Sequence, residues 1–333
     1  MIEIRELTKE SFKDFISLLS KRGRVITSFY EWKYINTTAP LIASGYVAYK
    51  DNLPLGCIGK LNKNIVDQKG KIVSATWFAD WYILEQSRGT GAGKALMQQV
   101  AASAKVGMGI PGPLHAQAVA AKAGYQSLHG FVEVRIPLNP WRVGLKKYKG
   151  PLIMRSLRGL NEMMIAAKWP HVKKVSVDLR KGFPPVDKWL AAIEQGLNKK
   201  IHFQRTREFL SWFSAMPFEE NMVREWWYYE SAEMFVTGFT DANTSGLRRS
   251  KVMELITYGN DIVACINQIV GILNSSAVDL VILLLPQFTA TALKIPRQWL
   301  LPIPLHITLG AKILPEYLSL IDKESSWIDF SLG

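Results

Sequence analysis

Two hydrophobic periodicities alternate along the chain and divide it into short strands and helices. Alternating or clustered apolar residues predict strands, which in the first half are residues 1–7, 44–49, 56–61, 72–84, 106–110 and 130–136. Apolar residues at helical spacing predict helices at residues 11–20, 94–105 and 115–123. Ser11 is a candidate helix cap, and Gly124 ends the third helix. This alternation is typical of an α/β or α+β fold.

The pattern weakens between about residues 141 and 185, where basic residues accumulate, and then starts again. We therefore expect a first domain at 1–142, a linker at 143–185 and a second domain at 186–333. The second domain has expected helices at 186–197 and 262–273 and expected strands at 222–229, 232–240, 251–257 and 278–285. The segment Phe29-Tyr30-Glu31-Trp32 resembles Phe209-Leu210-Ser211-Trp212, which lies 180 residues further along the chain. The repeated order predicts a duplicated unit.

Composition excludes several classes of protein. Hydrophobic residues make up 48% of the chain and charged residues 21%, which are values of a globular protein. The longest apolar run, residues 280–285, is far shorter than the roughly 20 residues of a membrane helix. The N-terminus has no signal-peptide pattern, and the two cysteines are too few for a disulfide framework or a cysteine-ligated zinc site. We expect a cytoplasmic protein with no membrane span.

The chain carries a clear positive surplus. Its 41 Lys and Arg against 28 Asp and Glu leave a net charge of +13. Basic clusters occur at residues 146–149, 173–174, 199–200 and 248–251, but none lies in a nucleic-acid-reading motif. We therefore expect a solvated basic face rather than a nucleic-acid partner, and the surplus favours a small acceptor that carries phosphate.

A glycine-rich turn lies between a predicted strand and a predicted helix. It reads Arg88-Gly89-Thr90-Gly91-Ala92-Gly93-Lys94. Glycine permits positive φ and close approach of a ligand to the backbone, and a helix N-terminus presents free N–H groups to an anion. The Walker A pattern fails because Ala95 follows Lys94, and the Rossmann pattern fails because residue 94 is not glycine.

Arg88, Gly91 and Gly93 form the pattern Arg-x-x-Gly-x-Gly, which resembles the acyl-CoA-binding motif of the GNAT acyltransferases. The resemblance covers about residues 1–140, and the Phe-x-x-Trp segments extend it to tandem GNAT proteins, including bacterial ones associated with sugars or cell-envelope precursors. It implies two GNAT-like domains, each with a mixed, mostly antiparallel twisted sheet flanked by helices. The second copy reads Tyr258-Gly259-Asn260-Asp261 at the place of the loop. We expect this copy to bind no CoA and to supply structure or part of the acceptor cleft.

The resemblance also implies where acetyl-CoA, or another acyl-CoA, binds as a co-substrate. Backbone amides of the loop would hold its pyrophosphate, with Arg88 in support, and the preceding strand would pair with pantetheine. The loop positions are Gly89, Thr90, Gly91, Ala92, Gly93 and Lys94, and the strand positions are Trp81, Tyr82 and Ile83.

Acyl transfer to an amine needs a base that takes the amine's proton. Asp80, between apolar Ala79 and Trp81, is the candidate base, although it could instead bond a backbone amide or pair with an arginine. Many GNAT enzymes carry a tyrosine acid four residues before the glycine that ends the next helix, and here that position is Ala120. Tyr125 and His115 are the substitutes close to the same helix.

The leading interpretation is an N-acyltransferase in which the amine of a small-molecule or sugar-type acceptor attacks acyl-CoA directly in a ternary complex. Direct attack is expected because neither Cys57 nor Cys265 lies near the motif. Two alternatives stay open: a tandem-GNAT transferase that uses aminoacyl-tRNA, and a regulatory protein that binds acyl-CoA without turnover. The five histidines show no metal-binding spacing and no Gly-x-Ser-x-Gly elbow is present, so we expect neither a metal nor a serine hydrolase.

Overall fold

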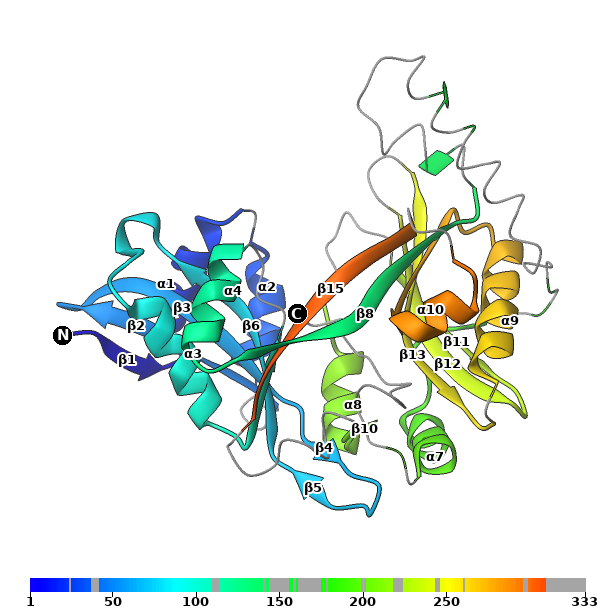
Figure 1. The fold of residues 1–333 in the computed structure, drawn as a ribbon, viewed down its shortest axis with the longest axis horizontal. Coiled ribbons are helices and arrows are strands. Elements are labelled where there is room, and N and C mark those ends of the chain that lie inside the picture. Colours follow the sequence, from blue (N-terminus) through cyan, green and yellow to red (C-terminus); the bar gives the residue numbers. More distant parts are fainter. Residues whose placement is uncertain are drawn as a thin grey trace.

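One twelve-stranded sheet passes through both halves of the molecule in the computed structural model of the chain (Figure 1). The structure describes residues 1–23, 25–36, 42–109, 114–139, 142–143, 156–157, 160, 175, 177, 179–198, 200, 202–217, 224–242, 246–259, 261–295 and 299–309. Most of the expected linker at 143–185 therefore lies outside the described residues.

The first half contributes the strands β1 (Glu3–Glu6), β2 (Ala43–Lys50), β3 (Leu53–Asn62), β6 (Ala75–Ile83), β7 (Val106–Gly109) and β8 (Gln126–Pro137). Its helices are α1 (Phe12–Ser20), α2 (Thr27–Tyr34), α3 (Ala92–Ala102) and α4 (Leu114–Lys122). A 3-10 turn at Glu85–Ser87 leads from β6 towards α3.

The second half contributes the strands β9 (Arg180–Lys181), β11 (Arg224–Glu230), β12 (Met234–Ala242), β13 (Arg248–Thr257), β14 (Leu280–Pro286) and β15 (Leu300–Leu309). Its helices are α7 (Val186–Leu197), α8 (Arg207–Ser214), α9 (Ile262–Ser275) and α10 (Gln287–Ala292). A separate small sheet joins β4 (Ile65–Val66) and β5 (Ile72–Val73) of the first half to β10 (His202–Phe203) of the second.

The strand order of the large sheet is β1-β2-β3-β6-β7-β15-β8-β14-β13-β12-β11-β9. Counted from its two edges towards the centre, the sheet has corresponding strands: β1 corresponds to β9, β2 to β11, β3 to β12, β6 to β13 and β7 to β14. At the centre the last strands are exchanged: β15 lies between β7 and β8, and β8 lies between β15 and β14. Figure 1 shows β8 and β15 crossing side by side from one half to the other. The two halves are therefore joined through main-chain hydrogen bonds.

Two pairs of strands in this sheet are parallel, and both open into a fork. β6 pairs with β7 over three residues from Ala75↔Val106, and β13 pairs with β14 over three residues from Arg249↔Leu280. All other neighbours with described register are antiparallel. The mixed, mostly antiparallel sheet flanked by helices confirms the predicted fold class.

Helices cover both faces of the sheet. Residues of α1, α2, α7 and α8 bury one hydrophobic cluster that is continuous through both halves. On the other face, α3 and α4 bury a cluster of the first half, and α9 and α10 bury a cluster of the second. The shared cluster and the exchanged strands predict that the halves stabilise each other.

Most elements expected from periodicity are present, but their limits and caps differ. Ser11 is the N-cap residue of α1 as expected, but its Oγ accepts a hydrogen bond from the Thr8 N–H and caps no helical amide. The expected strand at 72–84 is two strands, β5 and β6, and β8 begins earlier than residue 130. Helices α2 and α8 and strand β15 were not expected as elements. Within the described residues, no helix is both long and apolar enough to cross a bilayer.

Candidate active site

The turn from β6 into α3 is formed by glycines in a left-handed conformation. Gly89 has φ +86° and Gly91 has φ +92°, values that other residues rarely adopt. A Cβ atom built on either glycine would meet nothing within 4 Å, so the space above the loop is open. Gly91 is the N-cap of α3 and has no side chain to cap the helix, while the Ala92 N–H donates to Thr90 Oγ1 at 3.4 Å and the Thr90 N–H to the Ser87 backbone oxygen at 3.4 Å. The loop therefore leaves only part of its backbone uncovered.

The amides of this loop are available to an anion. The N–H groups of Gly89, Gly91, Gly93 and Lys94 have no acceptor within the part of the chain that the structure describes. They lie at the positive end of the α3 dipole, and the exposed Lys94 adds a formal charge. Arg88, also exposed, lies 3.6 Å from Glu85. This donor set suits a diphosphate.

Strand β6 has an open edge directly before the loop. Its last residue paired with β7 is Trp77, opposite Met108, whereas β6 continues to Ile83. The predicted contact residues Trp81, Tyr82 and Ile83 all lie beyond the described pairing with β7, and on the other edge of the strand Tyr82 and Ile83 pair with β3. An open strand edge offers main-chain N–H and C=O groups to an extended ligand that carries amides.

Trp81 connects the open edge to the loop. A Cβ atom on Gly93 would lie 3.3 Å from the Trp81 ring, so glycine allows the helix start to pack closely on the strand. The Trp81 indole N–H is buried and has no acceptor among the described residues. It is one further donor beside the loop amides.

Asp80 lies at an irregularity of the same strand. Its φ is +49°, and the register between β3 and β6 shifts here, from Gly59↔Ala79 to Cys57↔Tyr82. The extra residue is a β-bulge, which turns a side chain away from the regular alternation. The Asp80 carboxylate consequently faces α2.

Three side chains of α2 surround the Asp80 carboxylate. The Lys33 Nζ donates to Asp80 Oδ2 at 2.7 Å, and the Tyr34 hydroxyl donates to the same oxygen at 2.5 Å. The Tyr30 hydroxyl is 3.5 Å from Oδ1. Oδ2 is thus well bonded, and Oδ1 keeps capacity to accept another donor.

The tyrosines of this cluster stay protonated. Burial, and then the Asp80 charge, raises the pKa of Tyr34 well above its usual value. The same two causes raise the pKa of Tyr30. Both hydroxyls are therefore hydrogen-bond donors to the carboxylate across the physiological range. Sequence reasoning expected apolar surroundings and missed these partners, because α2 lies far from Asp80 in the chain.

Gly59 makes room for this arrangement. A Cβ atom on Gly59 of β3 would clash with the Tyr34 hydroxyl and ring. Glycine at this position therefore lets Tyr34 cross β3 and reach Asp80. No signal in the sequence marks Gly59 as part of the site.

Cys57 lies closer to the site than its sequence position suggests. Its Sγ is 3.9 Å from the backbone oxygen of Asp80, because β3 pairs with β6 at the bulge. Burial, and then the nearby carboxylate, raises the pKa of the Cys57 thiol well above its usual value. A protonated, fully buried thiol is a poor nucleophile.

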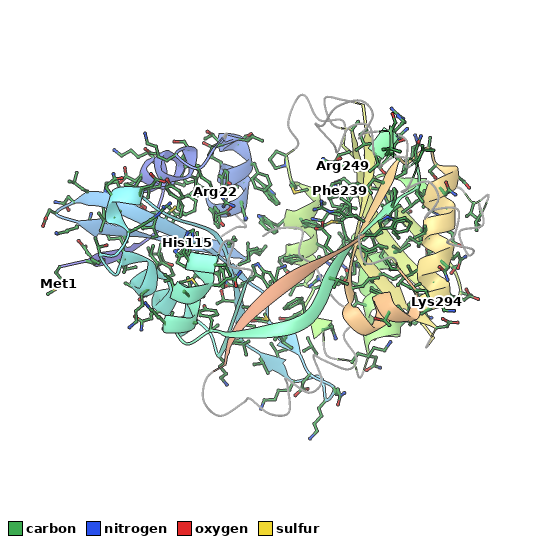
Figure 2. All side chains as sticks on the ribbon, turned by 45° about the horizontal axis from the view of Figure 1, so that its top comes forward. Met1, Arg22, His115, Phe239, Arg249 and Lys294 are labelled. Carbon is green, nitrogen blue, oxygen red and sulfur yellow. The ribbon has the colours of Figure 1, made fainter. Side chains whose placement is uncertain are left out.

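The structure does not bring Tyr125 and His115 to Asp80. Tyr125 is buried in the cluster between the sheet and α3, where its ring meets Phe78 edge to face with centroids 5.4 Å apart. His115 is exposed near the start of α4 in the first half of the molecule (Figure 2). Ala120 is buried in the same cluster as Tyr125. Among the described residues no three His, Cys, Asp or Glu side chains gather as metal ligands.

The second half carries a related but closed version of the site. The parallel pair β6–β7 begins at Ala75 and the parallel pair β13–β14 begins at Arg249, 174 residues later. Glu254 lies 174 residues after Asp80, so it occupies the position in β13 that corresponds to Asp80 in β6. Glu254 accepts from the Trp189 indole N–H and pairs with the buried Arg205 at 3.4 Å.

The helix start of the second half is also closed. The Asp261 side chain caps α9 by accepting from the Ala264 N–H at 2.8 Å. A carboxylate at this position occupies an amide and repels an anionic ligand. Of the two loops, the one in the first half therefore has the amides that are available to an anion.

The sequence matches no protein-family model and no curated protein, but the fold matches solved structures. A GCN5-related N-acetyltransferase from Anabaena variabilis shares 13% identity, with 92% of this chain and 72% of that chain covered and a TM-score of 0.62. A probable N-acyltransferase from Enterococcus faecalis shares 12% identity, with 93% and 73% covered and a TM-score of 0.59. Saccharomyces cerevisiae N-myristoyltransferase with bound myristoyl-CoA shares 14% identity, with 92% and 82% covered and a TM-score of 0.56.

These matches span nearly the whole chain rather than the first half alone. The chain has the GNAT fold of N-acyltransferases, as the resemblance predicted.

Proposed function

We propose that this protein is an N-acyltransferase that moves an acetyl or similar acyl group from acyl-CoA to an amine. The observation that carries the proposal is the continuity of three features on one strand and its loop. The free amides of Gly89, Gly91, Gly93 and Lys94 follow the open edge of β6, and that strand contains Asp80 at the bulge.

The residues present fit acyl-CoA as a co-substrate. The loop amides of Gly91, Gly93 and Lys94 would bind the diphosphate, with Arg88 and Lys94 providing positive charge. The free edge of β6 at residues 81–83 would hydrogen-bond the amides of the pantetheine arm. When bound, acyl-CoA supplies a thioester whose carbonyl carbon accepts the amine.

Asp80 is the proposed base. Its Oδ2 is engaged by Lys33 and Tyr34, so Oδ1 would accept the proton as the amine nitrogen bonds to the acyl carbon. The C–S bond then breaks, and the thiolate takes a proton. We propose that this proton is the one that Asp80 accepted, because Tyr125 is buried in the cluster against α3 and His115 lies exposed near the start of α4. The buried Cys57 takes no part as a nucleophile.

The acceptor is proposed to be a small amine, phosphate-bearing or sugar-linked. The net charge of +13 supports an acceptor with negative charge. The uncovered loop amides favour acyl-CoA over aminoacyl-tRNA as the donor, since they match a diphosphate without a further partner.

The test measures thiol release from acetyl-CoA with a panel of amino sugars, nucleotide-linked amino sugars and simple amines. Asp80→Asn should lower turnover by about 10²–10⁴-fold and retain acetyl-CoA binding. Asp14→Asn is the matched control, because Asp14 also accepts from a tyrosine hydroxyl, that of Tyr49 at 2.9 Å, but lies on α1 away from the loop. Full turnover in Asp80→Asn would contradict the role of Asp80. Acetyl-CoA binding with no turnover on any amine would favour the regulatory alternative.

A further inference from the structure

Helix α2 connects the second half of the molecule to Asp80 of the first. Its Trp32 stacks on Trp212 of α8, with ring centroids 4.4 Å apart and planes 10° apart. The Trp32 indole N–H donates to the backbone oxygen of Trp212 at 2.9 Å, and the Trp212 indole N–H donates to the backbone oxygen of Trp32 at 3.2 Å. Both side chains are buried. The two helices therefore hold each other through a reciprocal contact.

This contact holds the last turn of α2 in place. The helix ends at Tyr34, so the Trp32 carbonyl is one of the last four, which lack a partner within the helix. The Trp212 N–H supplies that partner from the second half. Because the bond and the stacked rings are buried, water does not readily replace them.

The same turn holds the carboxylate. Lys33 and Tyr34 follow Trp32 directly, and both donate to Asp80 Oδ2. Successive helical residues point about 100° apart, so one turn can face α8 with one side chain and β6 with the next two. Any shift of this turn would move both donors of Asp80 Oδ2 together.

The second half does not use its own helix in this way. Phe213 follows Trp212 at the position that Lys33 has after Trp32, and Glu254 is held by Trp189 and Arg205 instead. Helix α8 thus supports the carboxylate of Asp80 in the first half, through α2.

We infer that Trp212 is a positioning residue for Asp80: it fixes the end of α2 and, through Lys33 and Tyr34, the orientation of the carboxylate. The inference rests on the proposed function in that Asp80 is taken as the base. It gives the closed second half a defined part in the reaction, since a residue of that half sets the geometry of the proton acceptor.

The test is a double-mutant cycle on turnover. Trp212→Phe keeps an aromatic ring and removes the N–H donated to Trp32. It should lower kcat by between 10- and 100-fold, roughly the effect of a misplaced catalytic group, and leave the Kd for acetyl-CoA within about twofold. In an Asp80→Asn background it should change the residual turnover by less than about twofold. The matched control is Trp227→Phe, which removes an indole bond to Ser250 at 3.0 Å within the second half.

The inference is overturned if Trp212→Phe behaves like Trp227→Phe, or if it lowers turnover by the same factor with and without Asp80. A second measurement does not depend on turnover. Amide hydrogen exchange over β6, residues 75–83, should be faster in Trp212→Phe and in Lys33→Met than in the wild type, and unchanged in Trp227→Phe. If the wild type neither binds nor uses acetyl-CoA, the proposed function fails, and unchanged exchange in Trp212→Phe would separately refute the positioning role.

Discussion

The ion pair between Lys33 and Asp80 allows a quantitative prediction about stability. Lys33→Met keeps the length of the apolar stem and removes the ammonium. The Lys33 side chain is 2% exposed and that of Asp80 is 12% exposed, so the remaining carboxylate would be largely shielded from water. Removing one partner of a buried pair costs about 3–5 kcal/mol. Because Tyr34 would still donate to Asp80, we expect the lower end, about 3 kcal/mol.

Urea unfolding followed by the fluorescence of the 11 tryptophans measures this cost. With an m-value of about 3 kcal/mol/M, the midpoint should fall by about 1 M. The double variant Lys33→Met, Asp80→Asn should be less destabilised than the sum of the single variants, by about 2 kcal/mol.

An exposed pair provides the matched control. Lys188 lies 2.9 Å from Glu230, and its side chain is 42% exposed, so Lys188→Met should cost no more than about 1 kcal/mol. If Lys33→Met shifted the midpoint no more than this control, or if the double variant were additive, the buried pair would not be the device that holds Asp80.

Three further predictions concern the joining of the halves and the buried titratable groups. A chain ending at residue 142 should fail to fold as a monomer, because β15 pairs with both β7 and β8; a cooperative unfolding transition in that fragment would contradict the exchange of strands. Burial, and then the charge of Arg205, lowers the pKa of His202 in the folded protein. Neutral His202 therefore stabilises the fold fully above the unfolded pKa of about 6.5, and this stabilisation is lost as the pH falls below that value. His202→Gln should therefore reduce the drop in urea midpoint between about pH 7.5 and 5, and an undiminished drop would refute this assignment. Burial raises the pKa of the Cys57 thiol, so in a Cys265→Ser background iodoacetamide should label it in urea but not in the native protein near pH 8; rapid native labelling, followed by mass spectrometry, would disprove the burial.

Local features of the site could be predicted from the sequence. The glycines at 89 and 91 impose a loop conformation that depends on the residues themselves, and the apolar spacing of α3 follows directly after them. The repeated Phe-x-x-Trp segment also identifies Trp32 and Trp212 as equivalent positions of the two halves. The repeat does not predict that the two tryptophans contact each other, because equivalent positions in two copies need not be neighbours in space.

Features that depend on distant pairing could not be predicted. Tyr34 reaches Asp80 across β3, and this requires a glycine at position 59 that no local pattern distinguishes. The central position of β15 depends on which strand edges the two halves leave open. Such pairing is determined by the assembled sheet rather than by the periodicity of the segment itself.

Calorimetric titration with acetyl-CoA tests the central claim most directly. The wild type should bind one molecule per chain with a dissociation constant on the order of micromolar, typical of substrates of enzymes. Gly91→Glu places a carboxylate over the free amides and should abolish binding, after circular dichroism confirms that the variant folds. Gly259→Glu is the control, because Gly259 is an exposed glycine with open space in the corresponding turn of the second half. Binding lost only in Gly91→Glu would support the acyl-CoA site, whereas no binding by the wild type, or equal binding in both variants, would contradict it.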